Sequence, residues 1–208
     1  MSEPSSVVYV IDDDAGIRDA LKSLIRAEDL QVLVFGSAQE FRQAKRPDVP
    51  SCLILDVRLR GKSGLDFQCE LTEANIHIPI IFITGHGDIP MTVRAMKAGA
   101  IEFLTKPWRD QDLLDAVQVA LELDRGRRQR ETEIATLRAR FEMLTPRERE
   151  VLPPLIRGFR NKQIAAEIGI SEAAVKVHRS QLMRKVGANS LAELLRMAAE
   201  LGIPAKAA

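Results

Sequence analysis

The sequence predicts an α/β domain built on a doubly wound, five-stranded parallel sheet, followed by an all-α domain. Five short apolar segments alternate with helix-like segments over the first half of the chain, which is the pattern of a parallel sheet covered by helices. Polar side chains follow the carboxyl ends of most of these apolar segments. The last third of the chain has short helix patterns and no strand-like segment, so a separate helical domain is expected there.

The first domain is expected to alternate strand and helix five times. Strands are expected near residues 7–11, 31–35, 51–56, 79–83 and 101–104. Helices are expected near residues 15–28, 37–45, 64–74 and 89–98, and a fifth begins at Asp110. Asp14 and Asp110 are expected as helix N-caps, and Gly99 has the placement of a residue that ends a helix.

The central strand ends in a carboxylate, and other polar groups should gather around it. Residues 53–55 are all apolar, as in a strand buried on both faces, and Asp56 follows them. Asp12 and Asp13 follow the first strand, Thr84 follows the fourth, and Lys106 follows the fifth. Because the carboxyl ends of parallel strands share one crevice, these groups should converge on Asp56. The pattern indicates a site for a divalent cation and a phosphoryl group.

A long helical linker is expected next, because residues 113–144 contain no proline and one glycine, Gly126, where the helix could fray. Its apolar stripe consists of Leu121, Ile134, Leu137, Phe141 and Leu144. This stripe could form a coiled coil with a second subunit or pack on the chain's own domains, and the sequence leaves both open. The expected bounds are 1–122 for the first domain, 123–143 for the linker and 144–208 for the second domain.

The second domain is expected to contain four helices. Thr145 and Glu148 form a capping-box pattern at the start of the first helix, which should run to about Arg157. Pro153 and Pro154 are expected to kink or shorten this helix, because both lack a backbone N–H. Helices near 161–168, 172–186 and 190–201 follow. The tight turn between the second and the third makes a helix-turn-helix.

Charge is divided unevenly along the chain, although the net charge is only +1. Residues 127–208 carry 16 Lys and Arg against 9 Asp and Glu, whereas residues 1–126 carry 14 against 20. This asymmetry suggests that the second half meets a polyanion.

The sequence also predicts a cytoplasmic protein. No apolar segment approaches the roughly 18 residues that span a bilayer, and the N-terminus lacks the basic region of a secretory signal. Cys52 and Cys69 are too few for a disulfide framework, and both are expected as core or near-core thiols. His77, His86 and His178 lie too far apart in the sequence to form a metal-ligand pattern.

Several motifs in a fixed order resemble a known family. The acidic pair at 12–13, Asp56, the Thr-Gly pair at 84–85 and the Lys-Pro pair at 106–107 resemble a two-component receiver domain. Residues 144–152 (LTPREREVL), 161–165 (NKQIA) and 175–178 (VKVH) resemble the LuxR-type DNA-binding domain. Together they resemble response regulators of the NarL/FixJ family, and residues 84–100 are typical of its FixJ-like branch.

The resemblance implies a flavodoxin-like receiver in which Asp56 is the phosphoacceptor, a role for which carboxylates serve as nucleophiles. The implied ligands of Mg²⁺ (or Mn²⁺) are the side chains of Asp13 and Asp56 and the backbone carbonyl of Arg58, with Asp12 as a water-mediated or direct partner. The residues implied to bind or respond to the phosphoryl group are Thr84, Lys106 and Phe103.

The resemblance also assigns the third helix of the second domain to the major groove of DNA. The residues favoured for base contacts are Lys176, Val177 and Ser180. Those expected nearer the phosphates are Asn161, Lys162, His178, Arg179 and Lys185.

The implied function is phosphorylation-controlled regulation of transcription, and activation is the expected direction. A sensor histidine kinase would phosphorylate Asp56, and the receivers would then dimerise or release the second domain, which binds double-stranded promoter DNA and acts with RNA polymerase. No membrane partner is expected, and the protein itself is not expected to be a dedicated enzyme. A carboxylate-nucleophile phosphatase is disfavoured because Arg58 stands where its second aspartate is typical. Control of the receiver by protein contact, with constitutive DNA binding, remains the alternative.

The acceptor loop departs from the family pattern. Family members often have Met-Pro-Gly or a similar sequence there, whereas this chain has Leu59, Arg60 and Gly61, followed by Lys62. The change adds two positive charges beside the expected phosphoryl pocket. We expect it to alter kinase choice or the rate of dephosphorylation without removing a group that the reaction needs.

Overall fold

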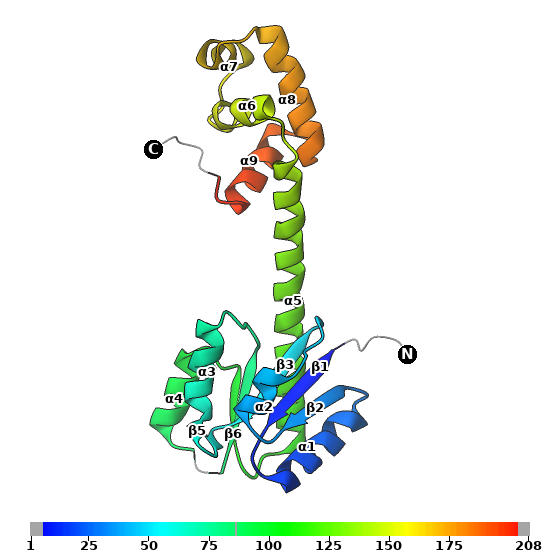
Figure 1. The fold of residues 1–208 in the computed structure, drawn as a ribbon, viewed down its shortest axis with the longest axis vertical. Helices are drawn as coiled ribbons and strands as arrows, with labels where there is room; N and C mark the ends of the chain where they lie inside the picture. The colour runs from blue at the N-terminus through cyan, green and yellow to red at the C-terminus, as the bar shows by residue number, and fades with distance from the viewer. Residues whose placement is uncertain (1–5, 86, 204–208) are drawn as a thin grey trace. The chain divides into compact units, whose positions relative to one another are not determined.

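The computed structural model describes residues 6–85 and 87–203, except for the side chain of Lys62. The expectations for His86 and for the charge of Lys62 therefore lie outside the described residues. The chain divides into two compact units, Met1–Arg128 and Gln129–Ala208 (Figure 1), which are described one at a time below as the first and the second unit. The expected domain bounds at 122 and 143 stay predictions.

The first unit is built on a five-stranded parallel sheet, which confirms the predicted fold class. Its strand order is β2-β1-β3-β6-β7. The strands are β1 Val7–Ile11, β2 Gln31–Phe35, β3 Ser51–Asp56, β6 Ile80–Thr84 and β7 Glu102–Thr105. The last two lie one residue later than expected, so Thr84 is the final residue of β6. From β1 the chain passes to β2 on one side of the central pair, and from β3 it passes to β6 on the other side. A crevice is expected between the carboxyl ends of β1 and β3, where the direction reverses.

Helices cover both faces of this sheet (Figure 1). They are α1 Ala15–Ala27, α2 Ala38–Gln43, α3 Gly64–Glu73, α4 Ile89–Lys97 and the first part of α5 Asp110–Glu142. In β1, Val8 and Val10 pack with residues of α1 and α5, whereas Val7, Tyr9 and Ile11 pack with residues of α2 and α3. Successive side chains of a strand point to opposite faces, so a wholly apolar strand serves two cores.

A short antiparallel hairpin follows the central strand, and the sequence did not predict it. It consists of β4 Arg58–Leu59 and β5 Lys62–Ser63. Gly61, at its turn, has φ +82°, a conformation that glycine adopts at little cost. A Cβ on Gly64 would lie 2.3 Å from the backbone oxygen of Asp56, so glycine is required where the hairpin folds back on β3. Strands of two residues are too short to produce a recognisable pattern.

Two of the expected helix ends in the first unit lie as predicted, whereas a third helix end and one cysteine do not. Asp14 is the N-cap of α1 and accepts hydrogen bonds from two backbone N–H groups, and Gly99 follows α4 with φ +90°, as predicted. Asp110 is not an N-cap: it is the first residue of α5, because the helical hydrogen bonds begin one residue earlier, at the carbonyl of Arg109. Cys52 is buried, but Cys69 is exposed, since it lies on the outer face of α3.

The second unit contains α6 Pro146–Ile156, α7 Asn161–Ile168, α8 Glu172–Val186 and α9 Leu191–Glu200. The capping box of Thr145 and Glu148 is present, and α7 ends at Gly169, which has φ +70°. The helix continues through Pro153 and Pro154 to Ile156, so the expected shortening of α6 is wrong, and the alternative expectation of a kink stays a prediction. The last turn of α6 still closes, since the N–H of Arg157 donates to the carbonyl of Pro153.

The apolar stripe of α5 packs largely into the chain's own cores. Leu121 is buried in the first unit, and Leu137, Phe141 and Leu144 are buried in the second. The packing alternative therefore holds for these four residues, and α5 continues through Gly126 without a break. In the described part of the chain, no helix is long and apolar enough to cross a membrane.

Candidate functional site

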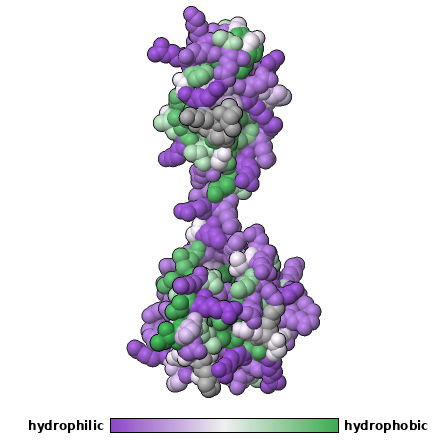
Figure 2. Space-filling model, turned by 90° about the vertical axis from the view of Figure 1, so that its left-hand side faces the viewer, coloured by the Kyte–Doolittle hydropathy of each residue, from purple (hydrophilic) through white to green (hydrophobic). Residues whose placement is uncertain are grey.

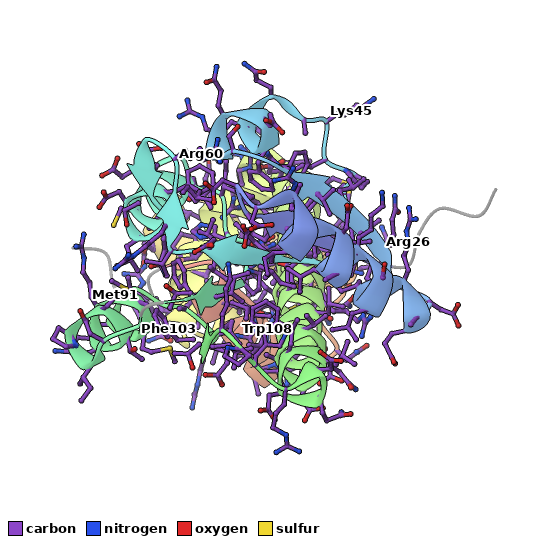
Figure 3. All side chains as sticks on the ribbon, turned by 90° about the horizontal axis from the view of Figure 1, so that it is seen from below. Arg26, Lys45, Arg60, Met91, Phe103 and Trp108 are labelled. Carbon is purple, nitrogen blue, oxygen red and sulfur yellow. The ribbon has the colours of Figure 1, made fainter. Side chains whose placement is uncertain are left out.

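The register of the sheet places four strand ends side by side. Ile11 pairs with Leu55, Asp56 pairs with Ile83, and Thr84 pairs with Thr105. The residues that end or follow these strands are therefore neighbours at one edge of the sheet. Figure 3 looks toward the first unit from below, with Arg60 labelled on one side and Phe103 and Trp108 on the other.

Lys106 joins the two most buried carboxylates of this edge. Its Nζ lies 2.7 Å from Oδ2 of Asp12 and 2.7 Å from Oδ2 of Asp56. Asp12 is fully buried and Asp56 is nearly so. The other oxygens are also bonded, because the N–H of Asp14 donates to Asp12 Oδ1 and the N–H of Arg58 donates to Asp56 Oδ1. The structure thus brings Asp12, Asp56 and Lys106 together, as predicted.

Electrostatics keep this lysine charged. Burial tends to lower the pKa of Lys106, but its hydrogen bonds to the two carboxylates outweigh burial and raise its pKa above the usual value. Burial raises the pKa of Asp12, against the opposing effect of Lys106. The two ion pairs therefore keep Lys106 protonated between the carboxylates of Asp12 and Asp56.

The acidic cluster fits a hard divalent cation. Carboxylate oxygens of Asp12, Asp13 and Asp56 lie within 4.8 Å of one another. Mg²⁺ prefers oxygen ligands and is held by one or two carboxylates together with waters. The three carboxylates of this cluster therefore supply the donors that such an ion requires. The Arg58 carbonyl as a further ligand stays a prediction.

Thr84 ends the strand next to the one that ends in Asp56, and Phe103 lies on the neighbouring strand β7. Thr84 is fully buried, and its backbone carbonyl accepts a hydrogen bond of 2.7 Å from the N–H of Lys106. Phe103 is half-buried, with its ring centroid 6.1 Å from that of Phe82. Their rearrangement on phosphorylation stays a prediction.

Two contacts were missed from the sequence, one at the site and one at the opposite edge of the sheet. Arg60 Nε donates to Asp13 Oδ2 at 2.9 Å, although 47 positions separate the two residues, and no local pattern indicates this pair. Asp124 on α5 is fully buried and accepts a hydrogen bond of 2.9 Å from the N–H of Ser51, the first residue of β3. Arginines three and four positions after Asp124 pair with it, and that spacing was a readable signal.

The predicted DNA-contacting residues fall into two groups. The exposed residues are Lys162 on α7 and Lys176, Val177 and Ser180 on α8. The partly buried residues are Asn161, His178, Arg179 and Lys185.

Three of the partly buried residues have partners inside the second unit. Arg179 Nη1 donates to Asn161 Oδ1 at 3.0 Å, which ties α8 to α7. Lys185 Nζ lies 2.7 Å from Oε2 of the buried Glu148, which ties α8 to the start of α6. Within the described residues, Nδ1 of His178 is buried without a hydrogen-bond partner. The DNA-contact roles themselves stay predictions.

A parallel α/β sheet with a lysine-bridged acidic site at its carboxyl edge, in one chain with a helix-turn-helix unit, defines the response regulators of two-component signalling. The family "Response regulator receiver domain" matches residues 8–118. The family "Bacterial regulatory proteins, luxR family" matches residues 142–198.

Similar proteins agree with this class. "Nodulation protein W" of Bradyrhizobium diazoefficiens is 56% identical over 96% of this chain and 88% of its own length. "Transcriptional regulatory protein FixJ" of the same species is 39% identical over 94% of this chain and 96% of its own. The structure of "Response Regulator StyR" matches with a TM-score of 0.85 at 48% identity, over 94% of this chain and 99% of that one.

The chain belongs to the NarL/FixJ family of response regulators, as the motifs predicted. It is a two-component transcription regulator with a receiver domain and a LuxR-type DNA-binding domain.

Proposed function

We propose that a sensor histidine kinase phosphorylates Asp56 and that this modification controls dimerisation and DNA binding. The observation that carries the proposal is the bridge from Lys106 to Asp12 and Asp56 at 2.7 Å each. It places a fixed cation beside a carboxylate that is nearly buried and lies next to two other acids. Such an arrangement offsets the negative charge that accumulates when a phosphoryl group meets a carboxylate.

The phosphoryl transfer exchanges a P–N bond for an O–P bond. An oxygen of Asp56 attacks the phosphorus of a phosphohistidine, the new O–P bond forms, and the P–N bond breaks as the imidazole leaves and takes a proton from water. Mg²⁺ held by the acidic cluster would offset charge on the phosphoryl oxygens. Lys106, already in contact with Asp56, would hold a phosphoryl oxygen as a point charge. Thr84, at the end of the neighbouring strand, would donate its hydroxyl to another.

An apolar surface on α4 supports dimerisation as the output. Ile89, Val93 and Met96 on this helix expose 80%, 44% and 42% of their surface. In Figure 2 the side of the first unit that carries α3 and α4 shows apolar patches among polar residues. Movement of Thr84 and Phe103 would alter the adjacent helix α4 and favour pairing of two copies there.

Dimerisation would set the geometry of DNA binding. Two copies of α8 presented by a two-fold dimer would read two related half-sites, and the complex would activate transcription through contact with RNA polymerase. The exposed side chains of Lys176, Val177 and Ser180 support α8 as the reader.

The test uses the full chain with Mg²⁺, before and after a small-molecule phosphodonor, in the wild type and in Asp56→Ala. Molecular mass in solution and binding to a pool of promoter DNA are measured on the same samples. We expect a doubled mass and tighter DNA binding in the wild type alone. Equal DNA binding and unchanged mass in both proteins would refute phosphorylation control and favour a receiver regulated by protein contact.

A further inference from the structure

The guanidinium group of Arg60 reaches the acidic site from a hairpin outside the five-stranded sheet. Arg60 Nε lies 2.9 Å from Asp13 Oδ2, and the two side chains are 87% and 26% exposed. Asp12 and Asp56 share Lys106. Asp13, the third carboxylate of the cluster, therefore takes its counter-ion from a different element, the β4–β5 hairpin.

The hairpin fixes the position from which Arg60 extends. Pairing of Arg58 with Ser63 and of Leu59 with Lys62 leaves Arg60 and Gly61 as the two turn residues. The hairpin is anchored at its base, because the N–H of Gly64 donates to the carbonyl of Val57 at 2.8 Å. Val57 directly follows Asp56, so the turn and the phosphoacceptor belong to one connected segment.

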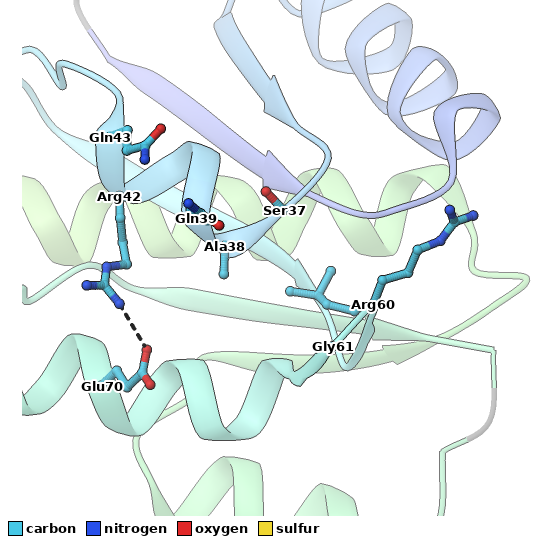
Figure 4. A pocket seen from close by; sticks show the side chains of 9 residues that line it. Ser37, Ala38, Gln39, Arg42, Gln43, Arg60, Gly61 and Glu70 are labelled. Carbon is cyan, nitrogen blue, oxygen red and sulfur yellow. Dashed lines mark ion pairs between the residues drawn. The ribbon is translucent and has the colours of Figure 1, made fainter.

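Arg60 is directed toward the acidic site and away from the cavity that it borders. A cavity of about 570 Å³ lies between α2, α3 and this hairpin, and Arg42, Arg60 and Glu70 line it. Arg42 pairs with Glu70 inside it at 3.6 Å. Figure 4 shows Arg60 extending away from that pair, toward the loop that follows β1. That loop carries Asp13.

A metal ion and Arg60 must compete for Asp13. A cation that recruits this carboxylate either displaces the guanidinium or shares an oxygen with it, in which case two positive groups lie close together. Because Arg60 is largely exposed, water and salt weaken both effects. Each effect is expected to change metal affinity by a factor of a few.

We propose that Arg60 is a displaceable counter-ion of Asp13 that weakens Mg²⁺ binding and thereby sets the Mg²⁺ concentration at which Asp56 becomes competent for phosphorylation. The inference rests on the proposed function, because it concerns the same acidic site. It gives the unusual acceptor loop a specific role: Arg60 is a positioning residue that acts through Asp13.

The test measures Mg²⁺ affinity directly in the full chain. Mg²⁺ is titrated by calorimetry and by the fluorescence of Trp108, the single tryptophan, which lies two residues after Lys106. Arg60→Ala and Arg60→Gln should bind Mg²⁺ about 2- to 5-fold more tightly than the wild type, and Arg60→Lys should remain close to it. The matched control is Arg42→Ala, which removes an exposed arginine of the same cavity that pairs with Glu70.

Salt dependence separates an electrostatic role from a structural one. The increase in Mg²⁺ affinity that Arg60→Ala causes should become smaller between about 50 mM and 500 mM ionic strength, because the Debye length falls over that range. Equal Mg²⁺ affinity in the wild type and Arg60→Ala would overturn the inference and leave the proposed function intact, as would an equal gain in Arg42→Ala. If the wild type binds no Mg²⁺ and matches Asp13→Asn, the metal site and the inference both fall.

Discussion

Replacing Asp124 by alanine should destabilise the first unit by about 3 kcal/mol. Asp124 is fully buried on α5, where it accepts the N–H of Ser51 at 2.9 Å. It also accepts hydrogen bonds from Arg127 at 2.6 Å and from Arg128 at 2.7 Å, and Arg128 pairs in addition with Asp48. This cluster attaches α5 to the beginning of the strand that ends in Asp56.

The magnitude follows from what each partner loses. The Ser51 N–H would be left buried without its acceptor, which costs about 1–3 kcal/mol. The two guanidinium groups are 32% and 27% exposed, so water replaces part of their loss and each contributes only about 0.5–1 kcal/mol. Asp124→Asn keeps an acceptor for Ser51 and should cost about half as much as alanine.

The assay is urea unfolding of the full chain, followed by the fluorescence of Trp108. This residue packs against the core of the first unit, so its signal reports that unit separately from the second. The control is Glu122→Ala, which removes an exposed acid from the same helix and should change stability by less than about 0.5 kcal/mol. An equally small loss in Asp124→Ala would refute the reasoning.

Three further predictions concern charged side chains. Lys106→Met should lower the stability of the first unit by about 2–3 kcal/mol at neutral pH, since two buried carboxylates lose their cation. Mg²⁺ should restore part of the lost stability, and equal urea midpoints of Lys106→Met with and without Mg²⁺ would contradict this expectation. Burial tends to raise the pKa of Glu148, but hydrogen bonds from Lys185 and from the Thr145 backbone outweigh it, so its pKa is lowered. This carboxylate therefore stabilises the second unit above its unfolded pKa of about 4.3, and that contribution is lost as pH falls further; hydrogen exchange of α8 should show the loss in the wild type and not in Glu148→Gln. Lys162→Ala should weaken DNA binding alike on all sequences and reduce the salt slope by about one; an altered sequence preference would assign it to bases instead.

The fold was predictable because its signals are local. Wholly apolar strands such as residues 53–55 and caps such as Asp14 and Thr145 each specify structure within a few positions. The acidic site was predictable for a topological reason, since parallel strands bring Asp12, Asp56 and Lys106 to one edge regardless of detail. The motifs that resemble response regulators pointed to the same residues.

The contacts that could not be predicted depend on side-chain reach across the chain. The pair of Arg60 and Asp13 requires the two-residue turn of a hairpin too short to leave a pattern. The ion pair of Lys185 with Glu148 was not predicted, because it requires the last turn of α8 to lie against the start of α6; the expected place of Lys185 near phosphates stays a prediction. Cys69 was misplaced because a short helix on a sheet has one buried face, and apolar character alone did not show which face that was.

The central claim is that Asp56 accepts the phosphoryl group, and intact-mass spectrometry tests it most directly. The full chain, Asp56→Asn and Lys106→Met are incubated with a small-molecule phosphodonor and Mg²⁺, and the mass of each protein is followed over time. We expect one phosphoryl group on the wild type, no modification when Mg²⁺ is omitted from the reaction, and none on Asp56→Asn. A wild type that stays unmodified, or an Asp56→Asn protein modified to the same extent, would contradict the account.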